Sequence, residues 1–370
     1  MKNKKLRAPC AGQIGFGLLG VACIVLLLTR ADSAVAAAGH GLSLCARTVI
    51  PALFPFMVCS ELLVASGGAT LLGRVLARPM QAVLGVPGAA ACPVLLGALC
   101  GFPVGARAVA ALYDQGALSA RQCTRLLTFI NNPSSAYLIS AVGGSLLGSR
   151  RLGLLLFGTS LLLSFITALV TRPLFGKDEP TPVPQTDLQV NADVFVGAVS
   201  TAAGGILSVC ALVVFFSAIL GTVRDLLGGL PQEIFALMYG AVELSGGMAE
   251  AAKISDPTKA AMACACLSGW SGLSVLCQIG TVCRGRGIRL LPYVIAKLAQ
   301  GVLGAAVVGL SVRYLFPLLP PENVHAGLLL PSGTAVLLAG TVNLAFLAGC
   351  LTLAVRQLKP MHRSRHADIY

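Results

Sequence analysis

Three charged side chains stand inside otherwise apolar stretches, and they are the first candidates for chemistry. Arg107 follows Gly-Phe-Pro-Val-Gly-Ala, while Glu61 and Glu243 are two acids embedded in apolar runs. A guanidinium at membrane depth costs about 2.5–3.5 kcal/mol on insertion scales, so it needs a carboxylate of the protein or an anionic ligand as a partner. The N–H groups of a guanidinium can donate two parallel hydrogen bonds to the two oxygens of one carboxylate. We therefore expect Arg107 to bind an anion, and each acid to pair with Arg107, bind a coupling cation or carry a proton.

Each of these residues also has a purely structural interpretation. Arg107 could lie near an interface and extend its side chain to the headgroups, since Asp114 follows two helical turns later. Glu61 and Glu243 could each form a structural ion pair or lie at an interface. The sequence leaves these alternatives open.

A run of neutral polar residues forms the second candidate site. Asn131, Asn132, Ser134 and Ser135 surround Pro133, which interrupts an apolar segment. Such a break offers amide and hydroxyl groups, together with a free helix N-terminus that attracts anions. In the second half of the chain, Ser271 lies at the corresponding place, between Ser268 and Ser274 and beside Trp270. The alternative is a solvated turn with an N-cap, which Asn and Ser also favour.

The elements that position these residues are membrane helices. Of the 370 residues, 56% are hydrophobic and 11% are charged, whereas soluble domains carry about 25% charged residues. This composition excludes an ordinary cytosolic enzyme, a disordered chain and a secreted disulfide scaffold. The four histidines are scattered, the 13 cysteines lack metal-ligand spacing, and no P-loop or catalytic triad spacing occurs. We therefore expect no enzyme activity, no cofactor and no metal.

The net charge of +13 reflects membrane sidedness rather than nucleic-acid binding, because basic residues gather at the ends of apolar runs. Basic residues precede the first span and follow the last, which predicts that both termini are cytoplasmic. Cleavage of the first run as a signal peptide and a lipid- or DNA-binding tail are the weaker alternatives. The strongest predicted spans are 11–29, 152–171, 206–223, 298–316 and 334–355.

Glycine and proline break the remaining apolar segments, which are 48–66, 89–112 and 126–148. Each break leaves backbone groups without helical partners, so it must be buried in protein or line a wet cavity. Similar Gly-rich stretches recur at 97–108 and 240–251, and paired breaks of this kind mark the midplane site of transporters. We predict an all-α polytopic membrane protein with two related halves that contain broken helices and re-entrant hairpins. Its parts are 1–47, a first repeat 48–172, a polar linker 173–193, a second repeat 194–316 and a C-terminal part 317–370.

The stretches VIPALFPFMVCSELL at 49–63 and GALCGFPVGARAVAALYDQGALSARQCTRLLTFINNPSSAYLISAVG at 97–143 carry a family resemblance. The sequence resembles the YlbJ (SpoVV) family of sporulation integral membrane proteins, which carry nucleoside-recognition (Gate) domains. The resemblance implies a multi-pass protein of the mother-cell membrane around the forespore that moves dipicolinic acid. It also implies hairpins and unwound helices around a midplane site, as in concentrative nucleoside transporters.

The composition, the broken helices and the family resemblance together lead to one functional hypothesis. The protein is a permease for a small organic anion, most plainly dipicolinate, which it exports from the mother cell toward the spore. The alternatives are a nucleoside-type metabolite carrier and a structural subunit of a sporulation complex. The sequence does not decide whether transport is coupled to a proton or sodium gradient, or whether the protein forms a homo-oligomer. We expect the protein to contact the lipid bilayer and not to bind nucleic acid. The residues expected to bind substrate are Arg107, Asn131, Asn132, Ser134, Ser135, Glu243, Ser271 and Glu61.

Overall fold

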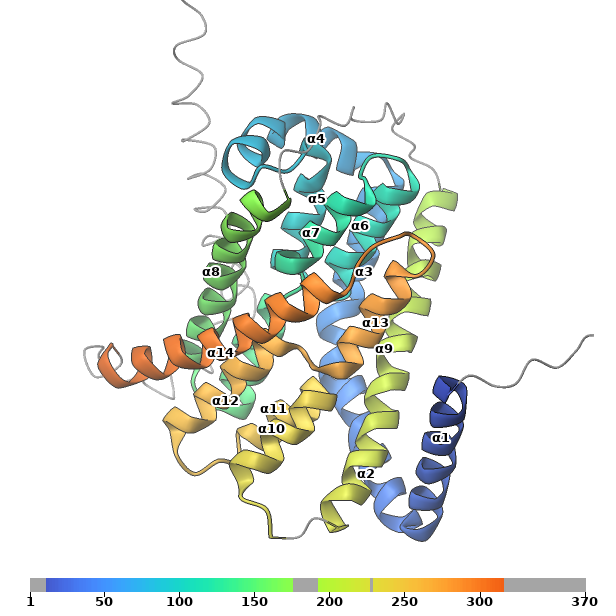
Figure 1. Cartoon of the computed structure of the whole chain (residues 1–370), viewed down its shortest axis with the longest axis vertical. Coiled ribbons are helices and arrows are strands. Elements are labelled where there is room, and N and C mark those ends of the chain that lie inside the picture. Colours follow the sequence, from blue (N-terminus) through green and yellow to red (C-terminus); the bar gives the residue numbers. More distant parts are fainter. Residues whose placement is uncertain (1–10, 176–191, 227–228, 316–370) are drawn as a thin grey trace, which may run out of the picture.

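The computed structural model describes residues 11–175, 192–226 and 229–315, and within these ranges every regular element is helical (Figure 1). Among the described residues, four helices are long and apolar enough to cross a membrane, and the number of crossings rises to six if each of two sharply bent helix pairs is one span. The predicted spans 152–171 and 206–223 are confirmed as such helices, and 298–314 of the predicted span 298–316 lies in a third. The predicted span 334–355, both basic termini and most of the linker 173–193 lie outside the described residues.

The first three helices form a bent arm along one side of the molecule (Figure 1). Helix α1 (Ala11–Thr29) meets α2 (Ala31–Leu44) near Arg30, and α2 continues through a π-helical turn (Cys45–Val49) into α3 (Ile50–Ala65). The predicted break within 48–66 is therefore wrong. Pro51 and Pro55 both lie within this continuous helix. The π turn before Pro51 shifts the hydrogen bonding, with the Ile50 amide donating to the Cys45 carbonyl.

Helices α5 and α6 form a hairpin that enters from one end of the molecule and turns back inside it (Figure 1). The hairpin turns at Gly101, which has φ of +76°, and at Pro103, which follows a cis peptide bond. This confirms the break predicted within 89–112. The elements before and within the hairpin are α4 (Gly68–Pro79), a π turn (Met80–Leu84), a 3-10 turn (Gly88–Ala90), α5 (Ala91–Leu99) and α6 (Val104–Asp114).

The span that follows this hairpin is unwound in its middle, as the sequence predicted. Helix α7 (Ala120–Ile130) ends at Asn131, residues 131–134 are non-helical, and the chain continues as a helix that includes the π-helical segment Tyr137–Leu146. Helix α8 (Arg150–Phe175) then returns as an unbroken span of 26 residues. The unwound residues lie in the interior of the molecule, where 131–134 are all buried.

The second part of the chain contains a hairpin that enters from the opposite end (Figure 1). Its arms α10 and α11 meet at Glu243, which lies outside both helices. Ser271, in the left-handed conformation with φ of 74°, separates α12 from α13 and makes a second broken span. The elements are α9 (Ala192–Leu226), α10 (Gln232–Val242), α11 (Leu244–Ala251), α12 (Pro257–Trp270), α13 (Gly272–Cys283) and α14 (Leu291–Tyr314).

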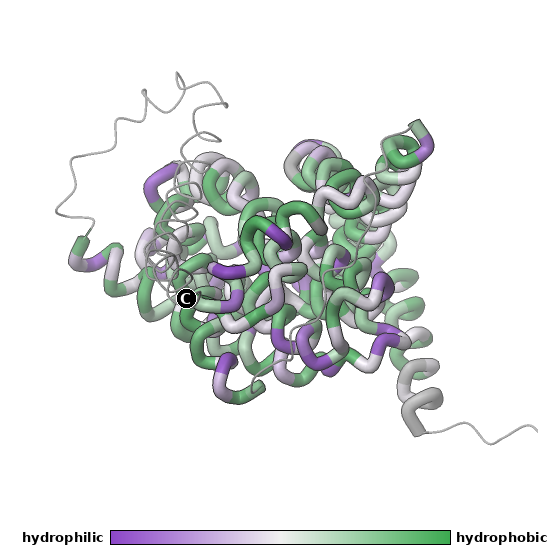
Figure 2. The backbone as a smooth tube through the Cα atoms, turned by 90° about the horizontal axis from the view of Figure 1, so that it is seen from above, coloured by the Kyte–Doolittle hydropathy of each residue, from purple (hydrophilic) through white to green (hydrophobic). Residues whose placement is uncertain are grey.

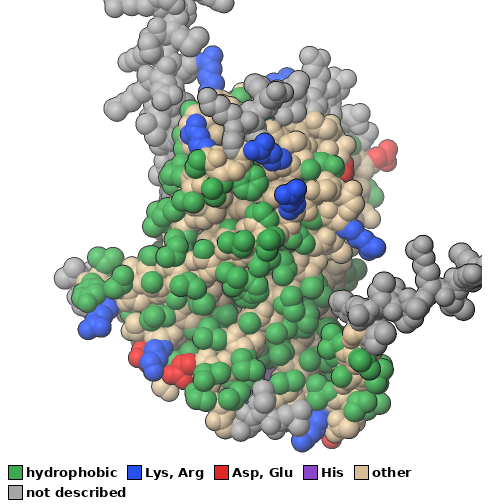
Figure 3. All heavy atoms as spheres, viewed as in Figure 1, with side chains coloured by type: hydrophobic (Ala, Val, Ile, Leu, Met, Phe, Trp, Pro, Cys, Tyr) green, Lys and Arg blue, Asp and Glu red, His purple; other side chains and the backbone are tan. Residues whose placement is uncertain are grey.

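Glycine pairs allow the arms of both hairpins to cross closely. A Cβ atom on Gly105 would come within 2.8 Å of the Gly97 Cα atom, and one on Gly247 would overlap the Gly240 Cα atom. Such close backbone approach is typical of helix packing in membranes. Hydrophobic residues predominate along the backbone (Figure 2). On the face that Figure 3 shows, the surface is largely apolar and the charged side chains lie mostly toward the two ends, as expected for a molecule whose sides face lipid.

Candidate functional site

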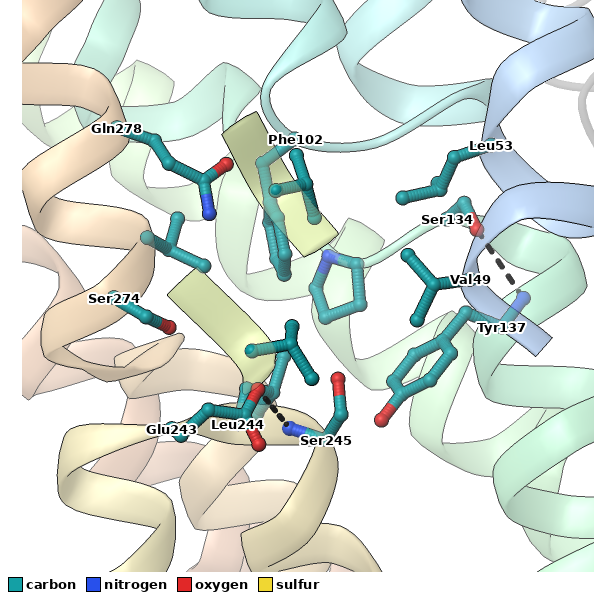
Figure 4. Close-up of a pocket in the computed structure, with 14 residues that line it drawn as sticks. Val49, Leu53, Phe102, Ser134, Tyr137, Glu243, Leu244, Ser245, Ser274 and Gln278 are labelled. Atoms are coloured by element: carbon teal, nitrogen blue, oxygen red, sulfur yellow. Dashed lines mark hydrogen bonds between the residues drawn. The ribbon is translucent and has the colours of Figure 1, made fainter. Parts of the chain in front are cut away.

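A small closed cavity lies where the two hairpin tips and the two broken spans meet (Figure 4). Its volume is about 40 Å³, which is enough for a few waters, since one water needs about 10–15 Å³ on this measure. The lining residues come from six helical elements and the breaks between them: Val49, Leu53, Phe102, Pro133, Ser134, Tyr137, Val209, Val213, Glu243, Leu244, Ser245, Ser274, Val275 and Gln278. The breaks that the sequence predicted therefore do surround one interior cavity.

Glu243 carries the only charged side chain among the described residues that line this cavity. It is 1% exposed, and its two carboxylate oxygens accept from the backbone amides of Ser245 at 2.9 Å and Gly246 at 2.6 Å. The carboxylate thereby caps the N-terminus of α11, where the helix dipole favours negative charge. Glu243 thus fixes the turn of the second hairpin and places a negative group beside the cavity.

Hydroxyl and amide groups supply the rest of the polar lining. The Ser134 Oγ accepts from the Tyr137 backbone amide at 3.2 Å and so caps the helix that follows the unwound segment. Figure 4 shows the hydroxyls of Tyr137 and Ser245 on the same side of the cavity as Glu243. Gln278 reaches the cavity from α13, and its buried Oε1 has no hydrogen-bond partner. The lining therefore offers neutral donors and acceptors to a polar solute.

Arg107 lies outside the closed cavity, in an open vestibule of about 890 Å³ between α6, α9 and α13. Its Nε donates to Glu61 Oε1 at 3.0 Å, and its Nη2 donates to the Thr201 carbonyl at 3.2 Å. The side chains of Arg107 and Glu61 are 26% and 23% exposed, so the pair is partly accessible from the vestibule. Gln278 lines both the vestibule and the closed cavity, which makes it the residue common to the two spaces.

A second ion pair marks the outer part of the same vestibule. Arg286 donates to both carboxylate oxygens of Asp114, at 2.8 and 2.7 Å. The Arg286 hydrogen bonds hold the pKa of Asp114 below its ordinary value, and both residues lie beyond the candidate spans. Each of the two arginines of this vestibule is thus matched by one carboxylate.

A further open space of about 530 Å³ lies between α2, α9 and the second hairpin, toward the opposite end. Here Glu250 accepts from Arg224 at 2.9 Å, from Lys253 at 2.6 Å and from Gln232 at 3.0 Å. Two cations therefore surround one carboxylate. The closed cavity is flanked by open vestibules, one beside each hairpin.

Four of the eight predicted substrate-binding residues do not line the closed cavity or the first vestibule. Asn131 donates to the Leu127 carbonyl, and Asn132 accepts from Ser164 and Lys297. The Ser135 hydroxyl donates to the Leu99 carbonyl at 3.3 Å, and the Ser271 hydroxyl donates to the Ser268 carbonyl at 3.3 Å. These side chains satisfy the broken backbone and its neighbours. Ser134 and Glu243 line the closed cavity, while Glu61 and Arg107 lie together in the vestibule; their binding of a substrate stays a prediction.

Sequence reasoning missed Lys297, Gln278 and Tyr137. Lys297 is 1% exposed within α14, and the predicted span beginning at 298 excluded it by a single residue. The signal was available, because Lys297 is an isolated cation in an apolar stretch between Arg289 and Arg313. Gln278 and Tyr137 gave no signal, since a single polar residue in an apolar helix does not show which face it occupies. Among the described residues, no group of three His, Cys, Asp or Glu side chains could hold a metal ion.

Comparison with known proteins finds a family model and a relative that match this chain. Residues 46–150 match the Gate family model, described as nucleoside recognition. The chain is 26% identical over 328 residues to the sporulation integral membrane protein YlbJ of Bacillus subtilis (strain 168), covering 78% of this chain and 80% of that protein. No solved structure matches the chain. The chain is a multi-pass integral membrane protein, a distant homologue of YlbJ that carries a Gate domain.

Proposed function

We propose that this protein is a carrier that moves a small organic anion, dipicolinate, across a membrane. The observation that carries the proposal is the closed cavity, mostly apolar with a few polar groups, between two hairpins that enter from opposite ends, flanked by an open vestibule beside each. A solute enters one vestibule, occupies the cavity when one hairpin moves, and leaves when the other moves. Broken helices around a midplane site are the general architecture of secondary transporters.

The proposal includes an internal repeat that relates the two halves in opposite orientations. Each half has a hairpin with a glycine pair, Gly97 with Gly105 and Gly240 with Gly247. In each half the hairpin is followed by a span broken at its centre and then by a long helix, α8 or α14. The sequential order of these elements supports a duplication of residues 48–172 as 194–316.

Arg107 is the proposed contact for a carboxylate of the solute. Its guanidinium is already bonded to a carboxylate, Glu61, in an open vestibule, so a carboxylate of an incoming dianion can take the place of Glu61 at the same donors. The closed cavity offers hydroxyl and amide groups from Ser134, Ser274 and Gln278 for the rest of a planar polar molecule. The choice of dipicolinate as the solute rests on the family resemblance. The proposal also includes transport from the mother cell toward the spore and a cytoplasmic location of both termini.

The test is flux of radiolabelled dipicolinate into liposomes that contain only the purified full chain. Wild type should give saturable uptake, Arg107→Ala should abolish it, and Lys259→Ala should leave it unchanged, because Lys259 is an exposed residue remote from the vestibule that contains Arg107. Equal uptake by wild type and Arg107→Ala would reject the role of Arg107.

Competition separates this substrate from the alternatives. Inhibition of uptake by unlabelled dipicolinate and not by nucleosides supports the anion, whereas the reverse supports a nucleoside-type carrier, as the description of the matching family model suggests. No uptake of either class, in protein that remains folded, would favour a structural subunit of a sporulation complex.

A further inference from the structure

Lys297 is a buried amine that the proposed transport path does not use. Its side chain lies inside the molecule, with the residue 1% exposed. The Nζ atom donates to Asn132 Oδ1 at 3.2 Å and to Gln300 Oε1 at 2.9 Å. Both acceptors are neutral amides, so the charge of a lysine ammonium here is hydrogen-bonded but not neutralised.

Within the described part of the chain, the helices packed most closely around Lys297 contain no acid that could neutralise it. Helix α14 packs against α7, α8 and α12, and none of these four helices contains an Asp or Glu residue. Their titratable residues near the level of Lys297 are Arg125 on α7, Cys264 and Cys266 on α12, and Tyr293 on α14, while α8 has none between 152 and 171. An isolated ionisable residue in a membrane interior is a functional-site candidate, because keeping it charged there is costly.

Asn132 connects Lys297 to the tip of the first hairpin. The side-chain Oδ1 of Asn132 accepts from Lys297 and from Ser164 at 2.9 Å, while its backbone carbonyl accepts from the Phe102 amide at 2.9 Å. Phe102 in turn lines the closed cavity. Lys297 is therefore hydrogen-bonded to the unwound segment, which is in turn hydrogen-bonded to the tip of the first hairpin.

A small polar cavity adjoins the same cluster. Gln300, Thr159, Ser160 and Ser268 contribute to its lining, and its volume is about 10 Å³, close to the room that one water needs, about 10–15 Å³ on this measure. Gln300 also donates to the Thr128 carbonyl at 3.2 Å and to the Thr167 hydroxyl at 2.9 Å. A water in this cavity would lie beside Gln300, whose Oε1 accepts from Lys297 Nζ.

We propose that Lys297 is the proton-coupling residue of this carrier, an inference that rests on the proposed function. With its proton, the Lys297 ammonium makes charge-assisted bonds that hold Asn132 and, through it, the first hairpin. When Nζ releases one proton to water, the same bonds become neutral ones of roughly half the strength. The hairpin tip then parts more readily from the unwound segment, so movement of one proton accompanies movement of the solute.

The test uses the full chain in liposomes with radiolabelled dipicolinate, and it measures two rates. One is exchange at equal pH on both sides, and the other is net uptake under an imposed pH gradient. In wild type the gradient should change net uptake by at least about fivefold, a typical coupling between two sites. In Lys297→Gln the ratio of gradient-driven to gradient-free uptake should fall to one, whereas Lys259→Gln, an exposed lysine, should keep the wild-type ratio.

A second variant controls for damage to the fold. Asn132→Asp supplies the missing carboxylate, keeps the ammonium charged and should also remove the gradient response. A gradient response that persists in Lys297→Gln, or is absent from wild type that exchanges dipicolinate, would overturn the proposal. Loss of exchange in both variants would show a structural role and overturn it as well. No exchange by wild type would instead reject the proposed function itself.

Discussion

The Arg107 guanidinium donates to the Glu61 carboxylate across 3.0 Å and so ties the returning arm of the first hairpin, α6, to α3. The two residues are 46 positions apart in the chain. Both side chains are about one quarter exposed in an open vestibule. The pair therefore joins a hairpin to its neighbouring helix within the open vestibule.

The Arg107–Glu61 pair should matter far more for transport than for folding. A partly exposed ion pair contributes about 0.2–1 kcal/mol to stability, so Arg107→Ala and Glu61→Gln should shift thermal unfolding only slightly. Arg107→Ala should nevertheless abolish dipicolinate uptake, and Arg107→Lys should restore only part of it, because a lysine cannot make the two-point contact. A large drop in unfolding temperature with unchanged uptake would show that the pair is structural.

Glu243 should be required for the stability of the second hairpin. Its carboxylate accepts from the amides of Ser245 and Gly246, and Glu243→Ala leaves both donors buried without that acceptor, which costs about 1–3 kcal/mol. Thermal unfolding in detergent should show a clear decrease for Glu243→Ala and a smaller one for Glu243→Gln, which keeps one acceptor oxygen. Identical unfolding of Glu243→Ala and wild type would contradict the capping role.

The crossing of the first hairpin should not tolerate a methyl group. A Cβ atom on Gly97 would overlap the Ile130 carbonyl oxygen, so Gly97→Ala should destabilise the protein by about 1–3 kcal/mol, the usual cost of overpacking. The matched control is Gly158→Ala in α8, where nothing lies within 4 Å of the added atom. That change should be neutral or slightly stabilising, because alanine favours helix over glycine. Equal effects of the two substitutions would refute the close crossing.

The Asp114–Arg286 pair should make a small contribution to the free energy of unfolding, and this contribution should depend on pH. Arg286 lowers the pKa of Asp114 from its ordinary value of 3.8, so the ionised form stabilises the folded state. This contribution is fully present above pH 3.8 and is lost as the pH falls through the lower folded-state value. Asp114→Asn should therefore unfold at a slightly lower temperature than wild type near neutral pH and at the same temperature in strong acid. A difference that persists in strong acid would not come from this ionisation.

Glycine and proline made the breaks around the closed cavity predictable. Gly101 and Pro103 mark the tip of the first hairpin, and Pro133 marks the unwound span, because glycine readily adopts a positive φ and proline removes a helical hydrogen bond. Pro51 and Pro55 were misleading, since the helix continues through both of them after a π-helical turn. A local rule identifies residues that can break a helix, but the hydrogen bonding of the neighbouring turns decides whether they do so.

The direction of side chains at the breaks could not be predicted. The sequence shows that Asn132 lies beside Pro133, but its contact with Lys297, 165 residues later, arises only from tertiary packing. The partner of Arg107 was left open between Glu61 and Glu243 for the same reason, and the structure selects Glu61. Long-range pairing of polar groups inside a membrane protein depends on helix rotation, which apolar sequence periodicity specifies poorly when helices are apolar on most faces.

Counterflow tests the carrier account most directly. Liposomes containing only the full chain are loaded with unlabelled dipicolinate, diluted into a trace of labelled dipicolinate, and compared with unloaded vesicles and with protein-free vesicles. A carrier whose two hairpins expose one cavity alternately should accumulate label transiently above its outside concentration, and only in loaded vesicles. Uptake that never exceeds equilibration, or that equals uptake by protein-free vesicles, would contradict the account.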